Sequence, residues 1–483
     1  MLCKPLVARE IKRNLREEKR EREKQEGKTA PIAVFCVYLQ FHLNGRTMKT
    51  TSTPPPLETP VPARGQGYGS VLSLTLAPMP RLRVGFVGLG ARGCQAVRRW
   101  CHLEGVEITA LCDASRQATE EGAQVVEQAG RPRPTLYWGE KAYGELCRRL
   151  DLHLVYVCTD WLSHTPIALE AMACGKCVAI EVPAATTLSD IWQLVDAAER
   201  SQLHCMMLEN SVYDHFEMSV RSIAQAGLFG HVVHVEGGYA HPIGERWTAW
   251  RMAYNQQTRG DLYPTHGLAP ACQLLGIHRT DRLERLVAMD TAAFSGPDVY
   301  RCLMDRPCNA FANGDQTSTL IRTAQGKTIS LQHNVMTPRP YSRFFQVVGT
   351  QGYAAKYPAE ELVFSSASAA KLGLETGVGD APLTPAQREK VLQKFRPPFS
   401  EQTLQLARQL DSRGGMSFLM DFRLAQCLQQ GLPLDMDVYD LAEWCCVAEL
   451  SRLSIEQGSV PVSVPDFTRG ALPSSLSSDF STP

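Results

Sequence analysis

Between residues 81 and 210, short apolar runs alternate with segments of helical periodicity. The runs have the length of buried parallel strands, and apolar residues recur at helical spacing between them. The apolar runs fall at 82–87, 106–112, 152–158, 177–180 and 205–209, and the helical segments end near Trp100 or cover 166–174 and 187–201. This alternation predicts an α/β domain built on a parallel sheet.

From residue 211 onward the pattern changes to a group of strand-like runs followed by helices. The runs fall at 231–240, 283–294, 318–323, 328–336 and 344–348, and the closing helical segments at 416–430 and 438–457. Strands grouped ahead of helices indicate an α+β domain. We therefore expect a first domain over 81–210 and a second over 211–470.

The two ends of the chain differ from these domains. Residues 9–28 are a run of mixed charge with almost no apolar stripe, and residues 50–69 are rich in threonine, proline and glycine. Such segments bury too little apolar surface to order themselves. We expect a poorly ordered extension and linker over 1–80 and a loose, serine-rich tail over 471–483.

Composition narrows the classes of partner. Lysine plus arginine and aspartate plus glutamate both number 50 in 483 residues, so no net charge draws the chain to nucleic acid or an anionic membrane. The apolar stretch 31–39 is too short to span a bilayer. We expect a small-molecule ligand, and a homo-oligomer is compatible with the sequence.

The number and spacing of the cysteines indicate the redox compartment and whether a metal site is expected. Sixteen cysteines lack the spacing of a disulfide framework, which favours a reducing compartment such as the cytoplasm, with export left as an alternative. Cys174 and Cys177 form a lone C-x-x-C without a second pair or a histidine at metal spacing. We therefore expect no metal site.

A glycine pattern follows the first apolar run. The segment reads Gly88-Leu-Gly90-Ala-Arg-Gly93 and leads into a helical stretch. The first glycine permits a tight turn, the second lets the backbone approach a pyrophosphate, and the third lets the helix pack with its N-terminus toward the anion. The spacing predicts a dinucleotide site, and a glycine turn in a cofactor-free fold is the alternative.

The second apolar run ends at Asp113, about twenty residues after the last glycine of the pattern. A carboxylate at this place can bind both hydroxyls of an adenosine ribose and would repel a 2′-phosphate. NAD is therefore favoured over NADP, although Arg116 could soften the preference.

Two side chains suited to a cofactor edge follow the third run. Trp161 and His164 lie in an expected loop ahead of the helix over 166–174. Ligands of open parallel sheets bind at the carboxyl ends of the strands. Trp161 would offer a flat apolar surface and His164 a hydrogen bond, and the alternative is that both simply fill the loop.

From Arg81 to about Gly470, these features resemble the Gfo/Idh/MocA group of NAD(P)-dependent sugar oxidoreductases. The resemblance implies a Rossmann domain followed by a domain with a large open, mainly antiparallel sheet. Dehydrogenases of that group usually carry Glu-Lys-Pro at the strand end where this chain has Glu181-Val182-Pro183, and their lysine serves in catalysis. Val182 therefore argues against an ordinary dehydrogenase.

A set of motifs in the same order resembles glycoside hydrolase family 109, the NAD-containing α-N-acetylgalactosaminidases. The motifs are Trp161-Leu-Ser-His164, Glu181-Val182, Glu209-Asn210, Gly237-Gly-Tyr239, Gly260-Asp-Leu-Tyr-Pro-Thr-His-Gly267, Arg339-Pro-Tyr341 and Val464-Pro-Asp-Phe-Thr-Arg-Gly470. The resemblance implies that NAD contacts come from Arg92, Gly93, Asp113, Trp161, His164, Glu181, Val182 and Asn210. Gly88 and Gly90 of the glycine pattern, with Leu162 and Ser163 inside the first motif, complete the expected cofactor contacts. It implies that sugar contacts come from Tyr239, Arg251, Tyr263, Thr265, His266 and Tyr341.

The usual glycosidase needs two carboxylates that flank the glycosidic bond, and the sequence offers no convincing pair. Bound NAD provides another route, in which oxidation at C3 of the sugar acidifies the C2 proton, the C1 substituent leaves, water adds and the hydride returns. Tyr263 and His266, in an expected loop stiffened by Pro264, are the candidate acid/base pair, with the steps undivided between them.

We expect an NAD-dependent glycosidase that acts on a terminal α-linked N-acetylgalactosamine, free or at the end of a glycan. An NAD-dependent sugar dehydrogenase is the first alternative. A non-catalytic NAD sensor is the second, and Arg251, Tyr263 and His266 disfavour it.

Overall fold

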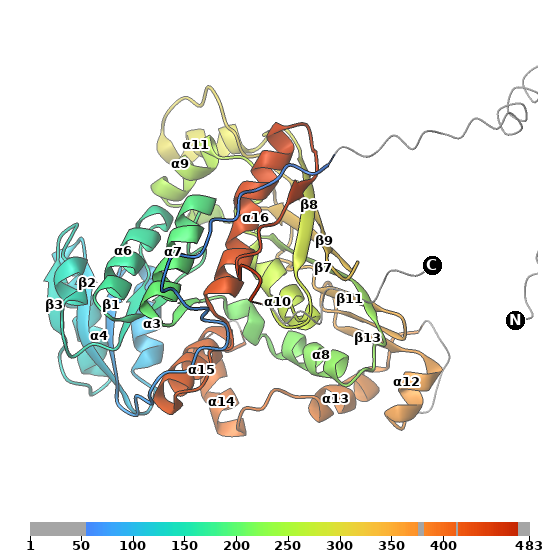
Figure 1. Cartoon of the computed structure of the whole chain (residues 1–483), viewed down its shortest axis with the longest axis horizontal. Coiled ribbons are helices and arrows are strands. Elements are labelled where there is room, and N and C mark those ends of the chain that lie inside the picture. Colours follow the sequence, from blue (N-terminus) through green and yellow to red (C-terminus); the bar gives the residue numbers. More distant parts are fainter. Residues whose placement is uncertain (1–54, 375–380, 412–413, 472–483) are drawn as a thin grey trace, which may run out of the picture. The chain divides into compact units, whose positions relative to one another are not determined.

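The computed structural model of the chain describes residues 55–374, 381–411 and 414–471, and all contacts reported below lie within Pro56–Pro483 (Figure 1). The expectations for residues 1–54 and 472–483 fall outside the described residues. Within the described ranges, no helix has the length and apolar content needed to cross a membrane.

The first sheet has six strands, all parallel, in the order β3-β2-β1-β4-β5-β6. Its strands are β1 (Leu82–Val87), β2 (Val106–Asp113), β3 (Thr135–Trp138), β4 (Leu154–Val157), β5 (Cys177–Ile180) and β6 (Cys205–Met207). The helices of this part are α3 (Ala91–Trp100), α4 (Arg116–Gln128), α5 (Tyr143–Cys147), α6 (Trp161–Ala173) and α7 (Leu188–Ser201). The predicted parallel α/β sheet is confirmed. The edge strand β3 escaped prediction because it has only four residues, Thr-Leu-Tyr-Trp, and none of them is buried.

The second sheet has eight strands in the order β13-β12-β11-β7-β10-β9-β8-β14. Its neighbours are antiparallel except for β7 and β10, so the mainly antiparallel sheet is confirmed. The strands are β7 (Val232–Ala240), β8 (Leu283–Asp290), β9 (Thr317–Thr323), β10 (Thr328–Asn334), β11 (Gln346–Gly349), β12 (Gly352–Ala355), β13 (Glu361–Phe364) and β14 (Val462–Ser463). Strands β12 to β14 are too short to be predicted from a periodic pattern of apolar residues.

The helices of this second part are α8 (His215–Gln225), α9 (Ala249–Gln257), α10 (Thr265–Leu275), α11 (Gly296–Met304), α12 (Ser366–Lys371), α13 (Pro385–Lys394), α14 (Glu401–Leu410), α15 (Met416–Gln430) and α16 (Val438–Glu456), with 3₁₀ turns η1 (Asn210–Tyr213) and η2 (Gly244–Arg246). Figure 1 shows α16 running between the two sheets, where it packs on α7 and β6 as well as on β8. Helix α15 contacts α3 and β1, so both closing helices join the two halves.

A buried ion pair marks the contact of α15 with the first sheet. The Arg99 side chain donates to Asp421 at 2.6 Å, and the Tyr156 hydroxyl donates to the same carboxylate at 3.3 Å. All three residues are at most 4% exposed. The second domain predicted over 211–470 thus includes helices that pack on both sheets, and its boundaries stay a prediction.

Residues 56–80 correct the prediction of a poorly ordered linker. Leu57 forms a parallel bridge with Val462 of β14, and the Arg64 guanidinium lies 2.9 Å from the fully buried Glu199 carboxylate. The side chain of Val71 is buried in the main core. The segment is ordered because it extends a sheet edge and neutralises a buried charge, neither of which its composition reveals.

Candidate active site

A cavity of about 1620 Å³ opens at the carboxyl ends of the first sheet and reaches the second. Ligand pockets usually measure about 300–1,000 Å³, so this one has room for a dinucleotide and a sugar together. Of the predicted cofactor contacts, those that line it are Gly88, Gly90, Arg92, Asp113, Trp161, Ser163, His164, Glu181 and Val182. Of the predicted sugar contacts, those that line it are Tyr239, Arg251, Tyr263 and His266.

The other predicted contacts lie beside or behind this cavity. Gly93 and Thr265 are buried under its wall, and Asn210 donates to Ser417, a wall residue, at 2.9 Å. Leu162 is 68% exposed and Tyr341 is 40% exposed, with the Tyr341 ring against Tyr239. Leu162 therefore does not face the cavity, because it lies on the outer side of the first turn of α6.

The glycine loop has the shape that a pyrophosphate needs. Gly88 has φ +92°, and a Cβ there would lie 2.6 Å from the Cys158 carbonyl. A Cβ on Gly93 would lie 2.0 Å from the Gly88 carbonyl oxygen, whereas a Cβ on Gly90 would meet no atom within 4 Å. Helix α3 starts beyond Gly90 with no side-chain cap, so its first N–H groups are open to an anion.

Asp113, at the end of β2, is fixed beside that loop. Its carboxylate oxygens accept hydrogen bonds from the backbone N–H of Leu89 at 2.6 Å and of Ser115 at 2.8 Å. The carboxylate lines the cavity next to the point where the pyrophosphate would lie. This is the position from which an acidic side chain holds the adenosine ribose.

Replacing Asp113 is expected to weaken NAD binding and to relax the discrimination against NADP. Hydrogen bonds to a charged group contribute about 1.5–3 kcal/mol, so Asp113→Ala should raise the Kd for NAD roughly 10- to 150-fold. Calorimetric titration with both dinucleotides measures the effect. Asp113→Asn keeps an acceptor for Leu89 and isolates the charge, and Asp190→Ala on α7 is the control outside the cavity. Unchanged affinities in Asp113→Ala would show that the ribose lies elsewhere.

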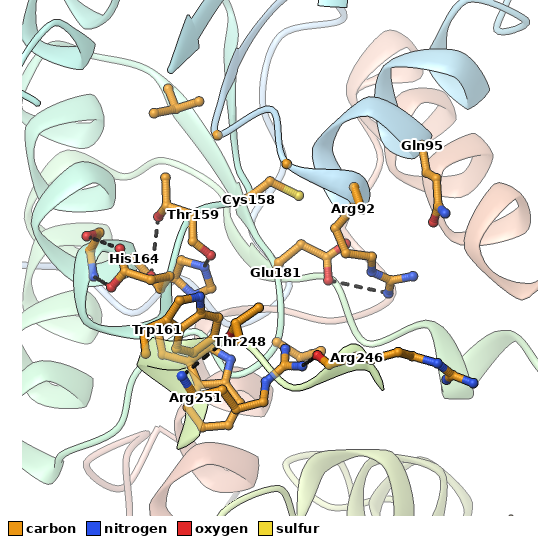
Figure 2. A pocket seen from close by; sticks show the side chains of 18 of the residues that line it. Arg92, Gln95, Cys158, Thr159, Trp161, His164, Glu181, Arg246, Thr248 and Arg251 are labelled. Atoms are coloured by element: carbon orange, nitrogen blue, oxygen red, sulfur yellow. Dashed lines mark hydrogen bonds and ion pairs between the residues drawn. The ribbon is translucent and has the colours of Figure 1, made fainter. Parts of the chain in front are cut away.

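The far end of the cofactor cavity carries a charged pair and an aromatic ring. Figure 2 shows Arg92 reaching Glu181, with 3.5 Å between the guanidinium and the carboxylate, and Arg251 lying against Trp161. The Arg251 guanidinium carbon is 5.5 Å from the Trp161 ring centre. Trp161 in turn stacks on Tyr263 with ring centres 5.9 Å apart. These contacts tie the end of the first sheet to the second part of the chain.

His164 is held by two backbone carbonyls. Its Nδ1 lies 2.8 Å from the Pro183 oxygen and its Nε2 3.1 Å from the Thr159 oxygen. Burial lowers the pKa of His164, while the two carbonyl acceptors act to raise it. A neutral ring has one N–H and can donate to only one of these carbonyls, whereas a protonated ring can donate to both.

Two segments predicted as loops are partly helical, because the helices that follow them begin earlier than expected. Helix α6 begins at Trp161, because the Asp160 carboxylate accepts from the N–H groups of Leu162 and Ser163. Helix α10 begins at Thr265, so His266 lies in a helical first turn and only Tyr263 precedes the helix. The predicted acid/base pair therefore spans a helix start rather than a loop.

His266 is oriented by a buried carboxylate. Its Nδ1 lies 2.6 Å from Oε1 of Glu209, and the Ser211 hydroxyl donates to the same oxygen at 2.8 Å. Burial acts to raise the pKa of Glu209, but the hydrogen bond from His266 and the positive charge that this ring carries when protonated outweigh burial and lower the pKa of Glu209 to about 2. Glu209 is thus an anion that accepts Nδ1–H, which leaves Nε2 of His266 as the ring nitrogen able to take a proton.

Two tyrosine rings lie against His266 on the cavity side. The Tyr239 ring centre is 5.2 Å and the Tyr263 ring centre 4.9 Å from the His266 ring. Burial, with the nearby Tyr239 and Glu209, raises the pKa of Tyr263 well above its usual value. Tyr263 therefore carries its proton at neutral pH and acts as a hydrogen-bond donor unless a cation comes close.

Sequence reasoning missed three residues of this site. Glu209 was noted only as part of a motif, and His241 and Arg246, which line the cavity beside Tyr239, were not considered. The Glu209 contact joins residues 57 apart, so no local pattern reveals it. His241 stands two residues after Tyr239, a spacing that puts both on one face of an extended strand, and this signal was available.

Comparisons with known proteins agree with this architecture. Residues 82–209 match an oxidoreductase family with an NAD-binding Rossmann fold, and residues 242–473 match the C-terminal domain of glycosyl hydrolase 109. A glycosyl hydrolase family 109 protein 1 of Phocaeicola vulgatus is 49% identical over 428 residues, 86% of this chain and 90% of that protein. A family 109 protein of Porphyromonas gingivalis is 46% identical over 446 residues, 90% of this chain and 95% of that one.

Solved structures share the fold. Levoglucosan dehydrogenase in complex with NADH has a TM-score of 0.60 at 17% identity, over 80% of this chain and 99% of that one. An oxidoreductase from Agrobacterium radiobacter in complex with NAD⁺, L-tartaric acid and magnesium has a TM-score of 0.55 at 16% identity, over 79% and 98%. Both resemblances stated from the motifs are thereby confirmed: the chain carries an NAD-binding Rossmann fold of the Gfo/Idh/MocA type and belongs to glycosyl hydrolase family 109.

Proposed function

We propose that the chain is a glycosidase that hydrolyses a terminal α-linked N-acetylgalactosamine and keeps its NAD through each turnover. One observation carries the proposal: the His266–Glu209 dyad opens into the same cavity as the glycine loop. A proton-transfer group and a dinucleotide site thus share one cavity.

The residues present fit NAD. The open Gly90, the uncapped start of α3 and the Asp113 carboxylate suit a pyrophosphate and a ribose, and Trp161 suits the flat nicotinamide end. When bound, NAD would accept a hydride from a sugar carbon and return it in the same turnover, so that the neighbouring C–H becomes acidic in between.

The chain's own residues supply the proton chemistry. Glu209 fixes the tautomer of His266, so that Nε2 takes a proton from the sugar and later gives it back. Tyr263 presents a hydroxyl beside it. Val182 lines the cavity at the position where the dehydrogenases that this chain resembles usually carry a catalytic lysine. No lysine at this position can therefore exchange a proton with a sugar hydroxyl.

Arg251 supports a sugar with an acetamide group. Its guanidinium lies between the Trp161 and Trp250 rings, 5.5 and 5.0 Å from their centres, and its buried Nε lacks a hydrogen-bond partner among the described residues. A buried donor of this kind is costly unless a ligand oxygen satisfies it. An acetamide carbonyl or a sugar hydroxyl would provide that oxygen.

The test is turnover of glycosides by the purified protein without added cofactor. We expect release of N-acetylgalactosamine from its α-nitrophenyl glycoside, no accumulation of NADH absorbance, and, in heavy water, deuterium at C2 of the released sugar. NADH that rises in step with sugar consumed would instead establish a dehydrogenase. Faster release from another α-linked sugar would move the substrate assignment and leave the cycle in place.

A further inference from the structure

A histidine stands on the core face of the second sheet, at a position that would otherwise be apolar. Alternate residues of a strand point to the same face, and Ile329, Leu331 and His333 form one such set on β10. Ile329 and Leu331 are fully buried, and His333 is 2% exposed. Because His333 lines the active-site cavity, the set changes from apolar to polar where the strand reaches the cavity.

The ring of His333 has a nitrogen without a partner. Its Nδ1 is enclosed and makes no hydrogen bond among the described residues. Buried polar side-chain atoms almost always have a hydrogen-bond partner, and one without a partner destabilises the fold. Proteins keep such unfavourable groups mainly at functional sites. His333 is therefore a candidate for contact with a ligand.

Burial decides how His333 is protonated. Burial lowers the pKa of the ring to about 4, so near pH 7 the ring is neutral and carries one proton. A buried N–H without an acceptor is rarer than a buried acceptor without a donor, which favours the proton on Nε2. Since Nδ1 is enclosed, Nε2 is also the nitrogen that can reach a ligand in the cavity. His333 thus presents one N–H donor to that ligand.

The sheet register places His333 one strand away from the proposed reaction centre. In the parallel pairing of β7 with β10, His333 lies beside Tyr239, and α10, which carries His266, packs mainly on β7. Neighbouring strands are about 4.8 Å apart, which is comparable with the width of a six-membered sugar ring. A sugar whose C2 lies at His266 can therefore extend the side of its ring that carries the C4 and C6 hydroxyls toward β10.

We infer that His333 is a specificity-determining residue whose Nε2–H donates a hydrogen bond to the C4 or C6 hydroxyl of the sugar. The inference rests on the proposed function, in which C1, C2 and C3 take part in the reaction and Arg251 meets the acetamide or a hydroxyl. A donor built to bind a hydroxyl is left unpaired by a sugar that lacks this hydroxyl, so the site discriminates against the deoxy sugar.

The test compares the NAD-loaded parent protein with His333→Phe, which keeps a ring and removes both nitrogens. The substrates are nitrophenyl α-glycosides of N-acetylgalactosamine and of its 4-deoxy and 6-deoxy analogues. For the parent, kcat/KM should fall roughly 5- to 150-fold on the analogue that lacks the bound hydroxyl, and His333→Phe should lose a similar factor on the complete sugar. The variant should lose less than about threefold more on that analogue, because the same hydrogen bond is already absent.

Two further variants separate the proposed contact from packing. A glutamine amide nitrogen can lie near the position of Nε2 and an asparagine amide nitrogen near that of Nδ1. His333→Gln should therefore recover much of kcat/KM on the complete sugar, and His333→Asn should not. The melting temperature of His333→Phe should not fall, because Nδ1 has no hydrogen bond to lose.

His204→Phe is the matched control. His204 is 5% exposed, and burial lowers its pKa to about 4, as for His333, but it lies outside the cavity. This variant should keep the parent's ratios of kcat/KM among the three sugars.

Three results would overturn the inference: no preference of the parent for the complete sugar over either analogue, equal losses of His333→Phe on all three sugars, or a loss that disappears only when the acetamide is replaced by a hydroxyl. Failure of the proposed function would look different, because the parent would then release no sugar from any of the glycosides. Calorimetric binding of the three free sugars to the parent and to His333→Phe needs no turnover, so it would still decide whether His333 recognises a hydroxyl.

Discussion

Replacing His266 by alanine is expected to lower glycoside turnover roughly 10²- to 10⁴-fold while NAD stays bound. The reason is that Nε2 of His266 is the proton acceptor that Glu209 prepares, whereas the glycine loop and Asp113 hold the dinucleotide from the other sheet. Initial rates on the nitrophenyl glycoside and mass spectrometry of retained NAD measure the two effects.

The control addresses the charge that His266→Ala leaves behind. Glu209 is fully buried, so removal of its partner can destabilise the fold. His266→Asn retains a hydrogen-bond donor toward Glu209 without a basic nitrogen and should be as inactive as the alanine variant with a cooperative thermal melt. Glu209→Gln should lose activity through the same ring. A folded His266 variant that hydrolyses substrate within a few-fold of the parent would make His266 structural.

The cofactor half was predictable because its determinants are local. The first glycine turn, the start of α3 and the acidic end of β2 lie within about thirty residues of one another, and each follows from a named backbone requirement. The structure bears out the physical reason at Gly88 and Gly93, where a Cβ would collide with backbone carbonyls. What the sequence could predict was therefore limited by how far apart the residues lie along the chain, and not by the kind of chemistry that they carry.

Two errors came from ignoring helix capping. Asp160 precedes Trp161, and an aspartate there is a common N-cap, so the start of α6 could have been read from the sequence. Pro264 stands immediately before α10 and makes no side-chain cap, but proline is common at helix starts because no backbone N–H is needed there. If α6 is taken to begin at Trp161 and α10 at Thr265, Leu162 lies on the outer side of α6 and His266 lies in the first turn of α10. Both positions agree with the structure.

The proton-transfer network could not have been predicted in full. Glu209 and His266 meet because β6 ends beside the start of α10, a tertiary arrangement that no periodicity encodes. Arg246 reaches His241 from a 3₁₀ turn whose geometry depends on the surrounding packing. Sequence patterns find residues that are close along the chain or that share a face, and Glu209 and His266, which are 57 residues apart, do neither.

The second large effect is expected from Gly267, which holds the acid/base residues against the second sheet. A Cβ on Gly267 would lie 1.9 Å from the Gly238 nitrogen and 2.6 Å from its Cα. These are backbone atoms of β7, so no side chain can move aside, and α10 must shift away from the strand. Thr265 and His266 lie in the same turn of α10 and would shift with it, away from Tyr239.

Gly267→Ala should therefore cost both stability and catalysis. Overpacking of a well-filled site destabilises by about 1–3 kcal/mol, occasionally more, and a displacement of about 1 Å at a catalytic group can lower the rate roughly 10²-fold. Thermal melts and kcat on the nitrophenyl glycoside measure the two losses, and NAD should still bind. Gly144→Ala is the matched control, because its Cβ would meet only the flexible end of Arg148, at 3.4 Å. Alanine favours helices over glycine, so that control should melt no lower than the parent. A Gly267→Ala protein with the parent's melting temperature and rate would mean that α10 and β7 are not packed as closely as these distances require, and the site built on their contact would have to be redrawn.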